Sequence, residues 1–182
     1  TQYTQPALFL FEASLAGMWL DYGLVPDFLL GHSVGELVAA YISGVLRAED
    51  AVKLVCARGR LMQGCENDGA MASIDASEAE VLEVIERIGK VNIAGLNTPR
   101  QTVISGDASL VLEVIEIFKG KGKKSTKLNV SHAFHSAHMD SMLGAFAEIA
   151  SDCHFSSPQI PIVSNITGEI ATEQELTSPD YW

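Results

Sequence analysis

The stretch Gly31-His32-Ser33-Val34-Gly35-Glu36 lies between an apolar run at 28–30 and a second apolar run at 37–42. This order predicts a strand, a tight turn that carries Ser33, and a helix. The two flanking glycines allow close approach of backbone to the turn. The amide of Val34 falls at the helix N-terminus, where unpaired N–H groups can stabilise an oxyanion. The pattern favours an exposed nucleophilic serine, although a Gly-Ser turn that only caps a helix has the same letters.

The segments around this turn predict an α/β core. Apolar residues at helical spacing begin near Pro6, a residue that suits a first helical turn, and stop before Gly23. Further helices are expected at about 34–44, 48–64 and 139–150, and further strand character at 160–164. The fold class expected is therefore a hydrolase-like α/β core with a parallel sheet and a strand-turn-helix elbow at Ser33.

The middle of the chain predicts a separate small subdomain. Its expected order is strand, helix, strand, strand, helix, strand, which is the ferredoxin-like βαββαβ pattern. Ser77 and Glu80 form a capping box at the start of its first helix. These elements are expected at 71–74, 77–88, 91–96, 102–105, 110–118 and 125–130. The predicted division is a core of residues 1–67 and 131–182 and an inserted subdomain of residues 68–130.

Composition excludes several classes of function. The 182 residues are 47% hydrophobic and 19% charged, with a net charge of −11, which argues against nucleic acid as a partner. The lysine run at 119–124 is either a solvated loop or a docking patch for an acidic partner or phosphates. No apolar run approaches the ~20 residues that span a bilayer, and no secretory signal is visible. Three cysteines without a C-x-x-C pair favour a reducing cytoplasm.

A serine hydroxyl needs a base within hydrogen-bond reach. Four histidines are candidates, and a fifth, His154, lies in a polar loop where solvation is the simpler interpretation. The segment 132–135 follows a predicted strand directly, at the end where α/β sites assemble, and each of its histidines also has a structural interpretation as a satisfied loop residue. No carboxylate or cysteine completes a metal-ligand set, so no metal site is predicted. The four candidates are His32, His132, His135 and His138.

Arg58 is a second candidate for chemistry. Arg60 lies roughly 160° around the predicted helix from Arg58, which leaves Arg58 on the apolar side, with Leu54 and Met62. A guanidinium in that position extends to solvent, pairs with a carboxylate of the chain, or holds the carboxylate of a substrate. Together with an acylating serine, the last alternative proposes a substrate that has a free carboxylate.

These features together resemble the acyltransferase domains of modular polyketide synthases, relatives of malonyl-CoA:acyl carrier protein transacylase. The resemblance extends over essentially the whole chain. It is carried by Thr4-Gln5-Pro6-Ala7-Leu8-Phe9, Gly31-His32-Ser33-Val34-Gly35-Glu36, Arg58-Gly59-Arg60-Leu61-Met62-Gln63, the ferredoxin-like insert, and His132-Ala133-Phe134-His135-Ser136.

The resemblance implies a transfer reaction through a seryl ester. Ser33 would be the nucleophile, His135 its general base and acid, and Arg58 the partner of the malonyl carboxylate. Phe134 would fill the space that an α-methyl branch needs, as in malonyl-selective domains, and the amide of Val34 would be an oxyanion donor. The acyl group would pass from malonyl-CoA to the phosphopantetheine thiol of an acyl carrier protein, within a multidomain synthase and without a cofactor. The remaining pocket residues implied are Gln5, His32 and Met62.

Two segments of the family have no counterpart here. One is an N-terminal Gly-Gln-Gly loop that supplies a second oxyanion donor, and the other is a C-terminal stretch whose carbonyl orients the histidine. The resemblance thus implies a core truncated at both ends. Two other functions remain open from the residues: an α/β-hydrolase-type thioesterase or esterase, and a catalytically silent domain that docks carrier proteins.

Overall fold

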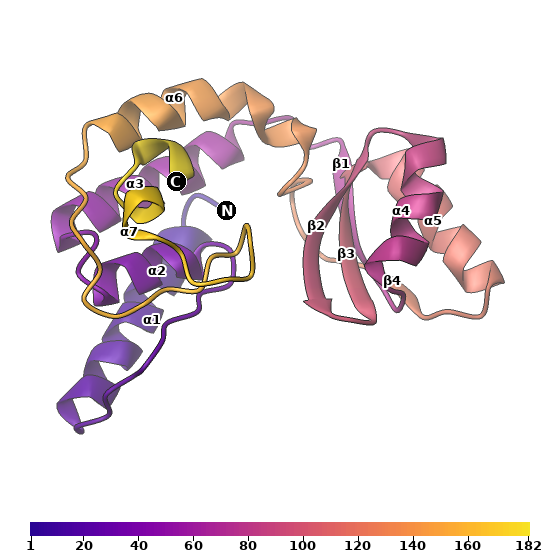
Figure 1. Ribbon diagram of the computed structural model, residues 1–182. Helices are drawn as coiled ribbons and strands as arrows, with labels where there is room; N and C mark the ends of the chain where they lie inside the picture. Colours follow the sequence, from indigo (N-terminus) through magenta and orange to yellow (C-terminus); the bar gives the residue numbers. More distant parts are fainter. The chain divides into compact units, whose positions relative to one another are not determined.

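The computed structural model describes residues 1–182, which group into two units (Figure 1). One unit comprises Thr1–Leu61 and Gly144–Trp182, and the other comprises Met62–Leu143. Helices α3 (Ala48–Gln63) and α6 (Asp140–Ser151) contain the two boundaries. The second unit includes the predicted subdomain, residues 68–130, together with residues 62–67 and 131–143, which the sequence places in the core. The division at 67/68 and 130/131 stays a prediction.

The first unit is largely helical. It contains α1 (Thr4–Asp21), α2 (Gly35–Ile42), α7 (Glu173–Leu176) and the short 3-10 helix η2 (Pro179–Tyr181), besides most of α3 and α6. The predicted helices on either side of the Ser33 turn are confirmed. Helices α1 and α2 end just before Gly23 and Gly44, whose φ angles of 85° and 83° are readily adopted by glycine.

Strand character in this unit is much smaller than predicted. The runs at 28–30 and 160–164 meet in a single parallel bridge between Leu29 and Ile162. The Leu29 N–H donates to the Pro161 carbonyl at 2.8 Å, and the Val163 N–H donates to the Leu29 carbonyl at 2.9 Å. The predicted strands are thus wrong in extent, because an apolar run forms a ladder only where successive residues find partners. The bridge still positions the segment that enters the Ser33 turn.

The second unit is built around an antiparallel sheet of order β2-β3-β1-β4. This is the ferredoxin-like arrangement that the order of elements predicts. The capping box of Ser77 and Glu80 at the start of α4 is confirmed. Strand β4 is shorter than expected. The elements are β1 (Gly69–Ile74), α4 (Glu78–Ile88), β2 (Val91–Thr98), β3 (Gln101–Asp107), α5 (Ala108–Gly120), β4 (Ser125–Lys127) and the 3-10 helix η1 (Ala137–Met139).

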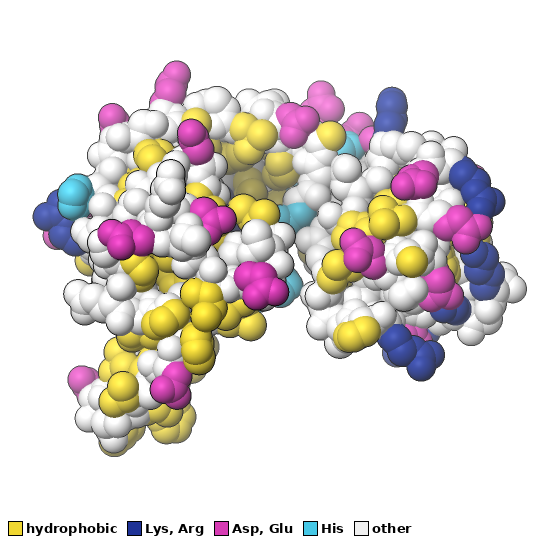
Figure 2. Space-filling view, viewed as in Figure 1, with side chains coloured by type: hydrophobic (Ala, Val, Ile, Leu, Met, Phe, Trp, Pro, Cys, Tyr) yellow, Lys and Arg dark blue, Asp and Glu magenta, His cyan; other side chains and the backbone are white.

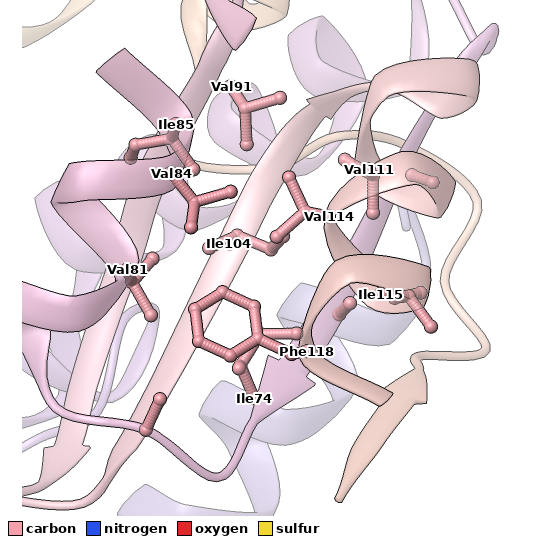
Figure 3. Close-up of a cluster of buried hydrophobic side chains, with 13 residues drawn as sticks. Ile74, Val81, Val84, Ile85, Val91, Ile104, Val111, Val114, Ile115 and Phe118 are labelled. Atoms are coloured by element: carbon pink, nitrogen blue, oxygen red, sulfur yellow. The ribbon is translucent and has the colours of Figure 1, made fainter. Parts of the chain in front are cut away.

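Helices α4 and α5 bury their apolar faces against the sheet (Figure 3). Phe118 and Val114 of α5 are fully buried, as are Ile74 of β1 and Ile104 of β3. Val81 of α4 lies in the same cluster, so both helices share one core with the strands. Burial of this kind contributes about 1.5–3 kcal/mol per large side chain. The sheet therefore has its own core.

The surface carries two distinct patches. Figure 2 shows hydrophobic side chains over α1 and the segment after it. Phe11, Trp19 and Phe28 are exposed residues of this region. Lys and Arg side chains gather on the other unit, where five lysines fall within residues 119–127. Two of these pair with glutamates, Lys119 with Glu116 and Lys123 with Glu80, as in an ordinary solvated face. None of the helices has both the length and the hydropathy needed to cross a membrane.

Candidate active site

Ser33 occupies a tight turn that requires a glycine at position 31. The φ of Ser33 is +55°, in the left-handed region that few side chains adopt. A Cβ on Gly31 would lie 2.0 Å from the backbone carbonyl of Gly35 and 2.4 Å from the nitrogen of Glu36. No side chain fits there, so the first glycine of the G-x-S-x-G pattern is required by close packing of backbone on backbone. The turn has the strained backbone typical of a nucleophile elbow.

The amides around Ser33 differ in what they bind. The N–H of Ser33 donates to Oδ1 of Asn165 at 2.9 Å, and the N–H of Gly35 donates to the His32 carbonyl at 3.0 Å. The N–H of Val34 lies between them, at the start of α2, and has no acceptor within the chain. It is therefore the amide at this turn that remains available to an anion. The role of Val34 as an oxyanion donor stays a prediction.

Arg58 links Ser33 to the buried side-chain amide of Gln5. Its Nη1 donates to Oε1 of Gln5 at 2.6 Å, and its Nη2 donates to Oγ of Ser33 at 3.3 Å. Gln5 is 5% exposed and donates from Nε2 to Oγ1 of Thr1 at 2.9 Å. Three side chains from α1, the elbow and α3 thus converge on one point. The structure brings together Ser33, Arg58 and Gln5, which the sequence placed in one site.

The environment of Arg58 lacks a carboxylate. On α3 its neighbours Leu54 and Val55 are buried, whereas Arg60 is exposed, so the predicted apolar placement of Arg58 is confirmed. Burial lowers the pKa of the guanidinium from its usual value to about 10. No ion pair of the chain includes it. A charge withdrawn from water without an anionic partner is unfavourable, and a ligand carboxylate would relieve that cost.

Sequence reasoning missed Asn165, which holds the elbow from the other side. Besides accepting from Ser33, it donates from Nδ2 to the Gly31 carbonyl at 2.6 Å. Its own N–H donates to Oε1 of Glu36 at 3.3 Å. Asn165 lies in a segment interpreted only as a turn, but it follows the run at 160–164 directly. The carboxyl end of a strand paired with the elbow strand is where α/β sites form, and that signal could have found it.

Glu36 was also missed, and it is buried next to the elbow. Its Oε1 accepts from the hydroxyl of Tyr181 at 2.5 Å, and the Tyr181 oxygen lies 2.7 Å from Oγ of Ser164. Burial raises the pKa of the Glu36 carboxyl, and the hydrogen bonds from Tyr181 and Asn165 oppose that rise. The pKa of Tyr181 is raised by burial and by this carboxylate. The network ties the first turn of α2 to the C-terminal segment.

The histidine candidates differ in their surroundings. His32 is exposed beside Ser33 in the first unit. In the second unit, His132 is buried, with its ring 5.7 Å from that of Phe134 and its Nδ1 2.8 Å from Oγ of Ser131. His138 contacts two aspartates of its own unit. His135 is exposed and has a φ of +59°.

The predicted site residues thus fall in both units. The half-buried Phe134 and the buried Met62 lie in the same unit as His135. The pairing of His135 with Ser33 stays a prediction, as do the pocket roles of Phe134, Met62 and His32. No cluster of three or more His, Cys, Asp or Glu side chains is placed to hold a metal ion. What the first unit alone presents is a serine on a strained turn, next to a half-buried cation and an unpaired amide.

Comparison with known proteins identifies relatives over the whole chain. A family described as "Acyl transferase domain" matches residues 1–182. The spectinabilin polyketide synthase system protein NorB of Streptomyces orinoci is 49% identical over 183 residues, which are 100% of this chain and 8% of that protein. Polyketide synthase GfsA of Streptomyces halstedii is 47% identical, and the chain covers 2% of its length. The chain thus spans less than a tenth of these curated relatives.

Solved structures agree on the fold. The acyltransferase domain from the second module of the salinomycin polyketide synthase superposes with a TM-score of 0.92 at 44% identity, over 94% of this chain and 41% of that one. FabD from Acinetobacter baumannii gives a TM-score of 0.91 at 35% identity, over 98% of this chain and 62% of that one. These neighbours confirm the α/β class that the sequence predicts.

Proposed function

The chain belongs to the acyl transferase domain family, and from that premise we propose that it transfers a malonyl group from malonyl-CoA to a carrier-protein thiol. The observation that carries the proposal is Arg58. This half-buried guanidinium donates to the nucleophile Ser33 and to the neutral amide of Gln5, and it pairs with no carboxylate of the chain. A fork of N–H donors suits a carboxylate in two-point contact. A malonyl thioester places such a carboxylate close to the reacting carbonyl.

The first half-reaction acylates Ser33. His135 removes the proton from Ser33 Oγ as the oxygen attacks the thioester carbonyl, and the N–H of Val34 stabilises the oxyanion that forms. Arg58 holds the malonyl carboxylate, and Gln5 keeps the guanidinium in place. The carbon–sulfur bond then breaks, and the CoA thiolate takes the proton from His135. The product is a malonyl ester on Ser33.

The second half-reaction transfers the group to another thiol. A phosphopantetheine thiol gives its proton to His135 and attacks the ester, and Ser33 takes the proton back as it leaves. We propose that the acceptor belongs to an acyl carrier protein and that the chain works among the other domains of a polyketide synthase. We further propose that Phe134 disfavours an α-methyl branch. A single methyl group discriminates by about 1–3 kcal/mol, so this selectivity is a preference.

The test follows a labelled malonyl group through both half-reactions. The chain is incubated with labelled malonyl-CoA, quenched, and digested to locate the label; pantetheine thiol is then added to a parallel sample. We expect label on the Ser33 peptide, its absence in Ser33→Ala, and its passage to the thiol. His135→Ala should slow acylation by about 10²- to 10⁴-fold.

Two results would overturn the proposal. Release of free malonate at a rate that added thiol does not change would identify a hydrolase. No label on Ser33 under conditions where the chain is folded and binds malonyl-CoA would identify a silent domain. A matched control is Ser151→Ala, which removes an exposed serine of α6 and should leave labelling unchanged.

A further inference from the structure

His138 is held by two carboxylates at once. Its Nε2 lies 2.8 Å from Oδ1 of Asp107, and its Nδ1 lies 3.3 Å from Oδ1 of Asp68. Only 11% of the side chain is exposed. The contact with Asp107 is a hydrogen bond, and the carboxylate of Asp68 lies close to the other ring nitrogen. These two contacts constrain the position and orientation of the ring.

Both aspartates lie at strand ends in the sheet of this unit. Asp107 ends β3 and is the residue before α5, and Asp68 stands directly before β1. The N–H of Ala108 donates to the Asp68 carbonyl at 3.3 Å, which ties the two positions to each other. Strand β1 is paired with β3 along its whole length. His138 therefore connects η1 to the ends of two paired strands, β1 and β3.

A second anchor lies on the other side of His135. Ala133 is fully buried, and a Cβ on Gly69 would come within 2.4 Å of the Ala133 Cβ. The same Cβ would lie 3.3 Å from Cε1 of His138, so the first residue of β1 packs against both anchors. In the sequence, His135 thus lies between Ala133 and His138, and both of these residues pack against Gly69 at the start of β1. Two further hydrogen bonds hold the residues between these anchors. Ser136 Oγ donates to the Ala133 carbonyl at 2.7 Å, and the Ala137 N–H donates to Oδ1 of Asn92 at 3.3 Å.

The backbone of His135 explains why such anchoring matters. Its φ of +59° is in the left-handed region, which costs a non-glycine residue free energy and persists only where the surroundings impose it. We propose that His138 is a positioning residue: through Asp107 and Asp68 it holds the segment that aims the His135 imidazole. The inference rests on the proposed function, in which His135 is the base of Ser33.

The test measures acylation of Ser33 by malonyl-CoA in a rapid-quench experiment on the full chain. We expect His138→Ala to lower the acylation rate constant by about 10- to 100-fold, because a small displacement of a catalytic group has effects of that size. The burst amplitude and the dissociation constant of malonyl-CoA should stay unchanged. His138→Gln should recover most of the rate, since its amide can still donate to Asp107. The matched control is His154→Ala, which removes an exposed histidine of the other unit.

Other outcomes separate this inference from the proposed function. A lower burst amplitude with an unchanged rate constant would mean that His138 only stabilises the fold, and would overturn the inference. In a His135→Ala background, His138→Ala should have no further effect on the rate, because it acts through His135. If His135→Ala leaves the rate unchanged, the proposed base fails, whatever His138 does. If His135→Ala abolishes acylation and His138→Ala does not alter it, the positioning role alone fails.

Hydrogen exchange provides a readout that does not depend on activity. His138→Ala should speed exchange of the amides of residues 131–139 by about 10-fold or more while exchange in β1 and β3 is unchanged, because local opening becomes easier. Unchanged exchange in 131–139 would contradict the anchoring.

Discussion

Asn165 illustrates how much of this site depends on one neutral side chain. Its amide accepts from the N–H of Ser33 and donates to the carbonyl of Gly31, so it binds the elbow on both sides of its bend. Because Asn165 accepts from the Ser33 N–H, the neighbouring Val34 N–H is the amide of this turn without an acceptor in the chain, and we propose it as the oxyanion donor. The elbow is therefore held in its strained form by a residue that is 132 positions away in sequence.

Replacing Asn165 should loosen the elbow. Asn165→Ala is expected to lower the free energy of unfolding by about 1–3 kcal/mol, since two backbone groups lose their partner. It should also slow acylation of Ser33 by at least about 10-fold, because Ser33 leaves its strained conformation. Asn165→Asp should be impaired as well, because its carboxylate can accept from Ser33 but repels the Gly31 carbonyl. Denaturant unfolding and rapid-quench acylation measure the two effects. Wild-type values for Asn165→Ala would refute the role, and the exposed Asn97→Ala is the control.

The buried carboxyl of Glu36 makes stability depend on pH. Because burial raises its pKa in the folded state, the folded chain holds this proton more tightly than the unfolded chain does. The protonated Glu36 carboxyl therefore adds to the free energy of unfolding at low pH. This contribution is lost as the pH rises from the ordinary carboxyl pKa through the raised pKa of the folded state. The hydroxyl of Tyr181 reduces that loss by donating to the carboxylate.

Tyr181→Phe should consequently destabilise the chain more at neutral pH than in acid. At about pH 7 the loss is expected to be about 1–3 kcal/mol, since a buried carboxylate loses a donor, and it should shrink toward about pH 4 as Glu36 is protonated. Urea unfolding at the two pH values measures the difference, with the exposed Tyr22→Phe as control. An equal loss at both pH values would show that Tyr181 does not act through the Glu36 charge.

At the scale of elements, short sequence patterns predicted the features that depend on interactions between residues close together in the sequence. Ser77 and Glu80 indicated the start of α4 because a capping box lies within one turn of chain, and the structure has both of its hydrogen bonds. The serine elbow, the burial of Arg58 and the βαββαβ order were predictable for the same reason. The strands at 28–30 and 160–164 were overestimated, because pairing depends on distant partners that periodicity does not reveal. The contacts of Asn165 and His138 also join residues far apart in sequence, and so they emerged only from the structure.

The cap of α4 provides a local test of stability. Ser77→Ala removes the acceptor for the Glu80 N–H and one of the donors to the Glu80 carboxylate. We expect the free energy of unfolding to fall by about 0.5–2 kcal/mol, the usual cost of losing an N-cap. Thermal or urea unfolding would measure it. A change within error, equal to that of the exposed Ser151→Ala, would contradict the importance of the cap.

At the scale of the whole molecule, the apolar surface of the first unit stands out. Large apolar side chains of α1 and of the segment that follows it are exposed. Figure 2 shows hydrophobic side chains gathered over this part of the unit. Soluble monomers rarely leave a contiguous apolar patch of this kind uncovered. Exposed large apolar side chains of this patch include Leu10, Phe11, Trp19, Tyr22, Leu24, Val25, Phe28 and Leu30.

This surface should determine how the isolated chain behaves in solution. We expect the chain to bind a hydrophobic dye and to self-associate as its concentration rises. Replacing Leu10 and Phe11 by lysine should reduce both effects while the far-ultraviolet circular dichroism is unchanged. Light scattering with dye fluorescence would follow the change. A wild-type chain that stays monomeric and binds no dye would show that the patch is covered in solution.

The central claim, that Arg58 selects a substrate by its carboxylate, is tested most directly by acylating Ser33 with malonyl-CoA and acetyl-CoA in competition. Mass spectrometry of the Ser33 peptide reads the ratio of the two esters. The wild-type chain should carry almost only malonyl. Arg58→Ala should lose malonyl acylation by about 100-fold or more, as expected when the partner of a buried charge is removed, and should keep or gain acetyl acylation. The exposed Arg60→Ala of the same helix should behave as wild type. Malonyl acylation undiminished in Arg58→Ala, or an equal loss of both esters, would contradict the account.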